Sequence, residues 1–279
     1  MTGDLNKKKA GRVRIKKGIH GKSRSNTLSQ EGTQSVHRTI SLIRTVADYD
    51  GRGGRLSQIA RKAGLPTATV HRILSVLVSE GFVEFDPMSK LYHLGIEMYT
   101  LGNRARKFTI RNKYHGSLER IAQETGNSVW LVLRSGFDAL CIDLVQGKFP
   151  IRIMAYEVGA RRPIGIGGAA SLSLLAFSPD EEIKTILEAN KNHHKAHNHF
   201  AEANLQRLIK DYRKLGYAFS QGTFLKSVNG VGVPIYNEEG KVIAAISVGA
   251  IAEWLDKTRA KKIADLIKSE IDSVSLTSD

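Results

Sequence analysis

The sequence predicts an α+β protein with two modest domains, the first mostly helical and the second built on an antiparallel sheet. Its 279 residues are more than one domain of common size holds, and its 41% hydrophobic and 25% charged residues are typical of a chain that buries a core. Helical spacing of apolar residues prevails before residue 81, and extended segments follow it. In the second half few consecutive strands are separated by single helices, which favours an antiparallel sheet over a doubly wound one.

Composition excludes several classes of protein. No window approaches the ~18 uninterrupted apolar residues that cross a bilayer, and no apolar stretch follows the basic N-terminus, so we expect neither a membrane span nor secretion. Cys141 is the single cysteine, which rules out an intramolecular disulfide and a multi-cysteine zinc site. One cysteine also suits a reducing compartment, so we expect a cytoplasmic protein.

The net charge of +15 is concentrated in the first part of the chain. Residues 1–110 hold 20 Lys and Arg against 8 Asp and Glu, whereas residues 111–279 hold 22 against 19. Such a positive block attracts a polyanion, with nucleic acid the leading candidate and an anionic membrane surface or ribosomal RNA the alternatives. Residues 1–33 carry nine of these cations without apolar periodicity and predict a disordered basic arm, either a non-specific phosphate contact or a solvated tail.

Residues 34–95 predict a winged helix-turn-helix. Apolar residues at helical intervals run from Val36 to Ala47 and end at the Gly51 to Gly54 cluster. Ser57 is the expected cap of a short second helix that stops at Gly64. A third helix starts near Pro66 and carries one apolar stripe, formed by Val70, Ile73, Leu74 and Leu77.

An extended hairpin follows the three helices. The segments 82–85 and 91–94 flank the turn formers Asp86, Pro87 and Ser89, which predicts the wing. The next apolar pattern predicts a linker helix over residues 96–108, within a linker region of 96–110.

Residues 111–279 predict the second, mixed domain. Strands are expected over 129–133, 139–145, 151–156 and 241–249. Helices are expected near 112–124, 168–177, 180–189, 202–214 and 254–274.

Seven segments carry a family resemblance. In the first half they are QSVHRTISLI from Gln34, LSQIARKAGLPTATVHRILSVLVSEGFVE from Leu56 and YHLG from Tyr92. In the second half they are TGNSVWL from Thr125, GARRPIGIGGAASLSLLA from Gly159, GYAFSQG from Gly216 and GKVIAAISVGA from Gly240. In this order they resemble the IclR family of bacterial transcriptional regulators. The resemblance implies a GAF-like effector domain that binds a small molecule, winged helices that pair, and dimers that can join into tetramers.

The third helix of the winged helix offers the residues for DNA. With its apolar stripe turned inward, the opposite face carries Ala68, His71, Arg72 and Ser75, with Thr67 and Thr69 at the N-terminal end. The two threonines suit a phosphate, and His71 suits either a base or a phosphate. Arg72 can engage guanine O6 and N7, or alternatively it pairs with Glu80 on the protein surface.

Two further features bear on DNA recognition. Lys90 beside the wing tip is a backbone contact or a solvated lysine. Relatives often have Lys and Ser where this chain has Thr67 and Ala68, which alters the operator it would recognise rather than the fold.

The effector site is implied mainly by the resemblance. Matching motif positions line the family's cavity, and here they are Gly167, Gly168, Ala169, Ser220, Gly230, Ser247 and Gly249. N–H groups at the start of the helix near 168 can hold a carboxylate, although the glycines also fit a tight turn. Some relatives have acidic or sulfur-bearing side chains where this chain has Ser220 and Gly230, so a larger or aromatic acid fits better than a two- or three-carbon acid.

Other chemistry is disfavoured. The glycine loop from Pro163 lacks both the Lys-Ser/Thr ending and the GxGxxG spacing of nucleotide sites, so no cofactor is expected. His193 and His197 have i, i+4 spacing in a cluster with His194 and His199, but the asparagines nearby indicate a loop and no carboxylate completes a metal site. Cys141 lies in an apolar strand pattern, as a structural thiol does.

The resulting hypothesis is a ligand-responsive regulator, not an enzyme, that binds an operator in double-stranded DNA. Its expected partners are a small organic or aromatic acid and at least one further copy of the chain. The alternative is a soluble small-molecule enzyme or an RNA-associated protein with a polyanion-binding arm. Binding that strongly prefers one promoter sequence separates the first hypothesis from the second.

Overall fold

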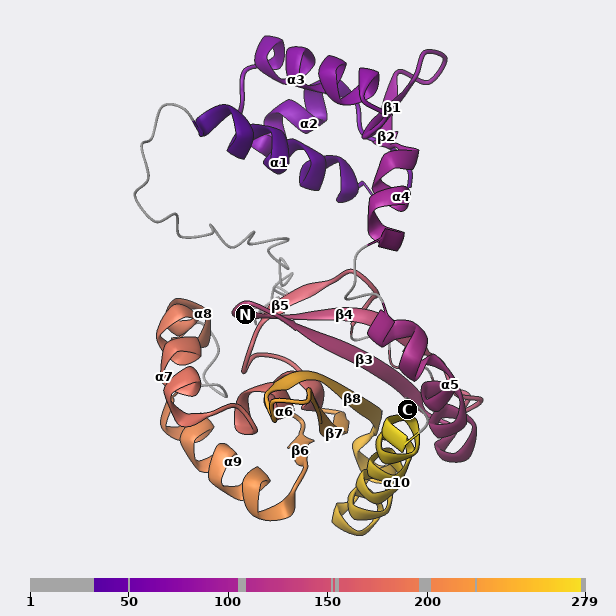
Figure 1. The fold of residues 1–279 in the computed structure, drawn as a ribbon, viewed down its shortest axis with the longest axis vertical. Helices are drawn as coiled ribbons and strands as arrows, with labels where there is room; N and C mark the ends of the chain where they lie inside the picture. Colours follow the sequence, from indigo (N-terminus) through magenta and orange to yellow (C-terminus); the bar gives the residue numbers. More distant parts are fainter. Residues whose placement is uncertain are drawn as a thin grey trace, which may run out of the picture. The chain divides into compact units, whose positions relative to one another are not determined.

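The structure of the chain is a computed structural model, which describes residues 33–49, 51–104, 109–151, 153, 156–195, 202–223 and 225–276 (Figure 1). The chain divides into two compact units, residues 1–102 and 103–279. The expected basic arm lies almost wholly outside the described residues, as do the last residues of the expected linker helix. Among the described residues no helix is both long and apolar enough to cross a membrane.

Three helices and a hairpin make up most of the first unit. The helices are α1 (Gln34–Ala47), α2 (Leu56–Ala63) and α3 (Thr67–Ser79), and α4 (Ile96–Arg104) follows the hairpin. The apolar faces of α1, α2 and α3 meet in one core, since the expected stripe of α3 is buried against Leu42 of α1 and Ile59 of α2. The buried residues of this core are Leu42, Val46, Ile59, Ala60, Val70, Leu74, Leu77, Val83 and Tyr92.

Helix α2 corrects one expectation. Ser57 does not cap it, because the helix already begins at Leu56 with Arg55 as its N-cap. The backbone N–H of Arg55 donates to Gln58 Oε1 at 3.0 Å, so a glutamine inside the first turn accepts the hydrogen bond of the N-cap backbone. The helix ends, as expected, at Gly64, whose φ of +66° is left-handed.

The hairpin is the expected wing. Strands β1 (Val83–Asp86) and β2 (Leu91–Leu94) pair antiparallel with Val83 opposite Leu94. Asp86 holds the turn, since its carboxylate accepts hydrogen bonds from the Met88 backbone N–H and the Ser89 hydroxyl. Tyr92 and Gly54 exchange two backbone hydrogen bonds of 3.0 Å, which tie the wing to the loop after α1.

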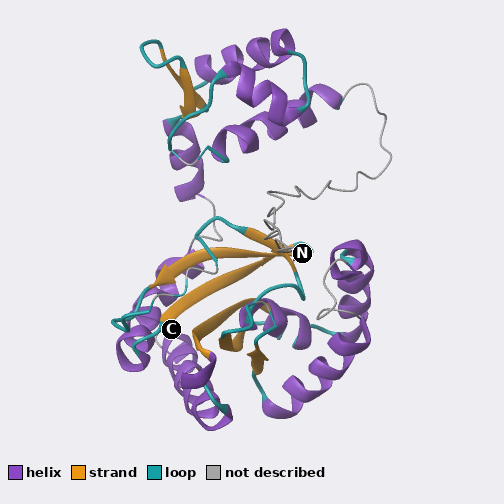
Figure 2. Cartoon of the chain, turned by 180° about the vertical axis from the view of Figure 1, so that it is seen from behind, coloured by secondary structure: helices purple, strands orange, loops and turns teal. Residues whose placement is uncertain are grey.

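The second unit is built on a six-stranded antiparallel sheet in the order β5-β4-β3-β8-β7-β6 (Figures 1 and 2). The strands are β3 (Ser128–Ser135), β4 (Asp138–Val145), β5 (Arg161–Pro163), β6 (Ala218–Gln221), β7 (Val228–Tyr236) and β8 (Val242–Ile251). The antiparallel prediction is therefore confirmed.

Helices cover both faces of this sheet, so its central strands are apolar on both sides. On β3 the side chains alternate: Val129 and Leu131 face α5 (Thr109–Thr125) and α10 (Lys257–Leu276), whereas Trp130 and Val132 face the other layer. That other layer consists of α6 (Ala169–Ala176), α7 (Asp180–Ala189), α8 (Lys191–Lys195) and α9 (Glu202–Leu215).

Several elements of this unit differ from those predicted from the sequence. Ile151, Ile153 and Tyr156, the described residues of an expected strand, lie outside the strands. Strands β5 and β7 were not predicted. The last helix begins at Lys257, after a short 3-10 turn, η3 (Ala252–Trp254), because the carboxylate of Asp256 accepts the Arg259 backbone N–H at 2.8 Å.

The stability of the first unit should depend on the buried side of α3. Leu74 is fully buried, so Leu74→Ala should lower the free energy of unfolding by about 2–5 kcal/mol through lost burial and an unfilled cavity. Val76 lies on the same helix and is 58% exposed, so Val76→Ala should change it by less than about 0.5 kcal/mol. Urea unfolding followed by circular dichroism measures both, and equal shifts of the midpoint would contradict the packing of α3.

Candidate functional site

The side of α3 opposite its buried stripe is open to solvent. Thr67, His71, Arg72 and Ser75 are exposed, as the helical spacing predicts, and Thr69 is half-buried. The Ser75 hydroxyl donates to the backbone carbonyl of His71 at 2.9 Å, which leaves it as an acceptor for a further donor. This face therefore combines a guanidinium, an imidazole and hydroxyl groups on one helix.

The start of α3 suits an anion. Pro66 occupies the N-cap, and among the described residues no side chain caps the helix. The first backbone N–H groups of a helix have no partner within it and carry a partial positive charge. Thr67 stands at this end of the helix, beside the N–H groups that a phosphate would use.

Arg72 has an alternative role in the sequence analysis, which is an ion pair with Glu80 on the protein surface in place of a contact with guanine. Within the described part of the chain, neither Glu80 nor another carboxylate forms an ion pair with Arg72. Its side chain is exposed on the surface of α3.

The wing adds a second polar surface to the same unit. Lys90 is exposed in the β1–β2 turn and has a left-handed backbone with φ of 59°. Met88, two residues earlier, is 91% exposed. The turn that presents both side chains is fixed by Asp86, whose pKa is lowered first by the hydrogen bond from the Ser89 hydroxyl.

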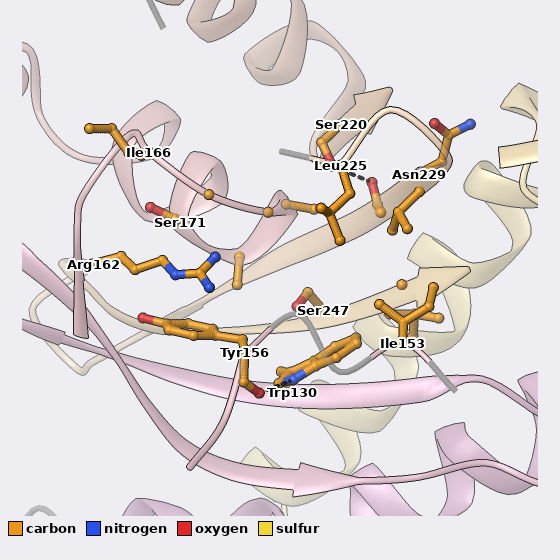
Figure 3. Close-up of a pocket in the computed structure, with 18 residues that line it drawn as sticks. Trp130, Ile153, Tyr156, Arg162, Ile166, Ser171, Ser220, Leu225, Asn229 and Ser247 are labelled. Atoms are coloured by element: carbon orange, nitrogen blue, oxygen red, sulfur yellow. Dashed lines mark hydrogen bonds between the residues drawn. The ribbon is translucent and has the colours of Figure 1, made fainter. Parts of the chain in front are cut away.

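A cavity of about 60 Å³ lies in the second unit between α6 and the sheet (Figure 3). This is several times the ~10–15 Å³ that one water molecule needs. The seven residues expected around an effector all line it: Gly167, Gly168, Ala169, Ser220, Gly230, Ser247 and Gly249. The structure thus brings together residues from the loop before α6 and from β6, β7 and β8.

Glycines shape the walls of this cavity. A Cβ on Gly249 would lie 2.9 Å from Cζ3 of Trp130, so the indole packs where only a glycine leaves room. A Cβ on Gly230 would lie 3.1 Å from the Ser220 hydroxyl oxygen and 3.2 Å from Cβ of Ala169. Any larger side chain at either position would displace a wall of the cavity.

The polar groups of the cavity are few. Ser247 is buried and its hydroxyl makes no hydrogen bond with the described residues, whereas Ser220 Oγ lies at a long 3.5 Å from the Gly230 carbonyl. Ser171 Oγ accepts the Gly165 backbone N–H at 3.0 Å and fixes the loop before α6. The side-chain amide of Asn229 donates to the Leu255 carbonyl at 2.9 Å, which ties β7 to the segment before α10.

Sequence reasoning missed the aromatic and cationic part of the wall. Trp130, Tyr156 and Arg162 all line the cavity, as do Ile153, Leu225 and Val228. Trp130 stands opposite Ser247 in the β3–β8 register, so the pairing of these two strands would have revealed it. Tyr156 lies at the end of a segment that was predicted as a strand and is not one, and Arg162 lies on β5, which the sequence did not predict.

The histidine cluster and Cys141 were the other candidate sites in the sequence. His193 and His194 lie on α8 rather than in a loop, and the ring of buried His194 hydrogen-bonds to the Ile164 carbonyl at 3.1 Å. His197 and His199 lie outside the described residues. Cys141 is buried, and desolvation raises the pKa of its thiol to about 12. Among the described residues no three His, Cys, Asp or Glu side chains gather as metal ligands.

A winged helix whose third helix exposes a polar face, followed in the same chain by a domain with a cavity, is typical of one class of protein: DNA-binding regulators that respond to a small molecule. Residues 35–87 match the family model "IclR helix-turn-helix domain", and residues 103–276 match "Bacterial transcriptional regulator IclR C-terminal". The chain therefore belongs to the IclR family of bacterial transcriptional regulators, which confirms the resemblance and the predicted pair of domains, a winged helix-turn-helix followed by an effector domain with an antiparallel sheet.

Individual relatives agree over most of the chain. The "HTH-type transcriptional repressor AllR" of Klebsiella pneumoniae is 24% identical over 88% of this chain and 90% of its own length. The crystal structure of the Thermotoga maritima IclR has a TM-score of 0.66 and 26% identity, and the match covers 88% of this chain and 98% of that one. An IclR homolog from Microbacterium hydrocarbonoxydans, complexed with 4-hydroxybenzoate, has the same fold with a TM-score of 0.72, 21% identity and coverage of 88% and 100%.

Proposed function

We propose that this regulator binds its operator through α3 and the wing, and that a small organic or aromatic acid in the cavity of the second unit changes its affinity for DNA. The exposed polar face of α3 carries the first part of the proposal. The domains we propose are a basic arm at 1–33, a winged helix at 34–95, a linker helix at 96–110 and an effector-binding domain at 111–279. We propose regulation rather than catalysis because the matched relatives are named as transcriptional regulators, and a cytoplasmic location because bacterial DNA lies there.

The DNA contacts divide into base recognition and backbone contacts. Arg72 lies on the exposed face of α3 and offers the planar fork that matches guanine O6 and N7 in the major groove. His71 and Ser75 flank it, and Thr67 and Thr69 stand at the helix start, where a phosphate is favoured. Lys90 on the wing supplies a phosphate contact.

The cavity supports the ligand part of the proposal. Its wall includes the start of α6, where backbone N–H groups favour an anion, together with the hydroxyls of Ser220 and Ser247. The 4-hydroxybenzoate in the Microbacterium relative is an acid of the proposed class. Such a ligand shifts DNA binding only by its differential affinity for the two states of the protein.

A second copy of the chain completes the DNA-binding unit. One winged helix makes a small interface, and a pair of them matches the symmetry of a pseudo-palindromic operator. Helices α1 and α4 of the first unit expose apolar side chains that suit self-association, namely Val36, Ile40, Ile96, Tyr99 and Leu101.

Two substitutions should separate base recognition from backbone contact. Arg72→Ala should remove the preference for the operator over unrelated DNA, because a bidentate base contact contributes about 1–3 kcal/mol of discrimination. Lys90→Ala should weaken both DNAs alike and reduce the salt dependence by about one phosphate contact. Gel shifts on both DNAs across a salt series measure this, and unchanged discrimination in Arg72→Ala would refute the role of Arg72.

One substitution should block the cavity without affecting DNA binding. Leucine in place of Ser247 would fill the space opposite Trp130, so Ser247→Leu should abolish the thermal stabilisation that organic and aromatic acids give to the wild type. Ser269→Leu, on an exposed position of α10, is the matched control and should keep the stabilisation. Equal stabilisation of Ser247→Leu and the wild type would show that the acid binds elsewhere.

The oligomeric state is directly measurable. Light scattering at micromolar concentration should give at least twice the chain mass of 30.7 kDa, with and without operator DNA. A mass of one chain under both conditions would contradict the paired winged helices.

A further inference from the structure

The side chain of Arg162, which is charged, projects into the cavity. Arg162 of β5 points toward the start of α6, and Figure 3 shows its guanidinium between Tyr156 and Ser171. A Cβ placed on Gly167 would lie 3.7 Å from Cδ of Arg162 and 3.9 Å from its Nη1. The guanidinium therefore stands beside the same helix start that favours an anion.

The aromatic neighbours of Arg162 are held in place. The Arg162 Cζ atom lies 4.7 Å from the centre of the Tyr156 ring, a cation–π stacking distance. The Tyr156 hydroxyl donates to the Ala139 carbonyl, and the Tyr156 carbonyl accepts the indole N–H of Trp130 at 2.8 Å. The guanidinium and two aromatic rings thus form a preorganised group, which lowers the entropy cost of binding a ligand.

The Tyr156 ring occupies one side of the guanidinium, whose N–H donors lie in its own plane. Burial lowers the pKa of Arg162, yet a guanidinium remains protonated at neutral pH. Among the described residues that line the cavity, Arg162 is the one charged side chain, so it brings a positive charge to this part of the wall.

The remaining wall suits a planar apolar body. It includes the rings of Trp130 and Tyr156 together with the aliphatic side chains of Ile153, Leu225 and Val228. A ligand that satisfies both parts of the wall has an acidic group at one end and a flat ring at the other.

We propose that Arg162 is the residue that sets the ligand specificity of this cavity, by pairing through its guanidinium with the carboxylate of an aromatic acid whose ring lies along Trp130 and Tyr156. This inference rests on the proposed function, which places the ligand in this cavity. It adds the side chain that distinguishes an acid from a neutral molecule of the same shape. If the backbone N–H groups of α6 alone bound the acid, the preference for acids over neutral molecules would be the same whatever side chain stood at position 162.

The test compares acids with amides of the same shape. Benzoate, 4-hydroxybenzoate and phenylacetate, each paired with its amide, are titrated into the full-length protein by calorimetry in the absence of DNA. At least one acid should bind wild type roughly 10- to 100-fold more tightly than its amide, because a charge-assisted pair is lost in the amide. Arg162→Met should weaken acid binding by that factor and leave amide binding unchanged.

The neighbouring arginine provides a matched control. Arg161 belongs to the same strand but is exposed, and its guanidinium donates to Ser135 Oγ at 2.8 Å, so Arg161→Met removes one positive charge without altering the cavity wall. It should retain the preference for acids. Arg162→Lys keeps the charge but loses the planar fork, so its acid affinity should fall between those of wild type and Arg162→Met.

Three results would overturn the inference. They are no binding of any acid to the wild type, equal binding of acids and amides, or a preference for acids that survives in Arg162→Met. If Arg162→Met fails to fold, Arg162→Lys decides, and an acid affinity equal to wild type refutes the role of the fork. Sequence-selective DNA binding by the wild type is measured separately. Its absence would refute the proposed DNA-binding function, whereas an acid preference that does not depend on Arg162 would refute only the role of Arg162.

Discussion

The arrangement of the second unit depends on the close approach of α6 to strand β7. A Cβ on Gly232 would come within 3.0 Å of the Ala169 carbonyl oxygen, so the first turn of α6 rests directly on the strand backbone. Only a glycine permits this contact, because any other side chain would push the helix away from the sheet. With α6 held there, its first residues and the preceding loop close over β6, β7 and β8, and the cavity is the space that remains.

A related constraint explains a proline in the same strand. Pro234 lacks the N–H that an interior strand position needs. Strand β6 pairs with β7 only as far as Gly232, so beyond that point β7 is an edge on the side away from β8. The short β6 thus permits Pro234, and together the glycines and the proline give β7 a composition that is unusual for a central strand.

The sequence predicted the first unit better than the second for a physical reason. In the winged helix, local periodicity sets each element, since Val70, Leu74 and Leu77 define the buried side of α3 without reference to distant residues. In the second unit β7 contains Gly230, Gly232 and Pro234, which are poor strand formers. The sequence pattern therefore did not predict this strand. The cavity glycines and serines were found by family resemblance, whereas Tyr156 and Arg162 were missed because tertiary packing alone brings them to the wall.

The two tryptophans of the chain lie in contrasting surroundings. Trp130 is buried in the cavity wall with its indole N–H bonded to a carbonyl, whereas Trp254 is 53% exposed beside Phe149 and the Arg259 guanidinium. Indole fluorescence shifts to shorter wavelength in an apolar environment and is quenched by contact with many aromatic molecules. The protein therefore carries an optical reporter in the cavity wall: a molecule that enters the cavity should change the emission of Trp130 without any attached dye. The exposed Trp254 contributes a second emission at longer wavelength.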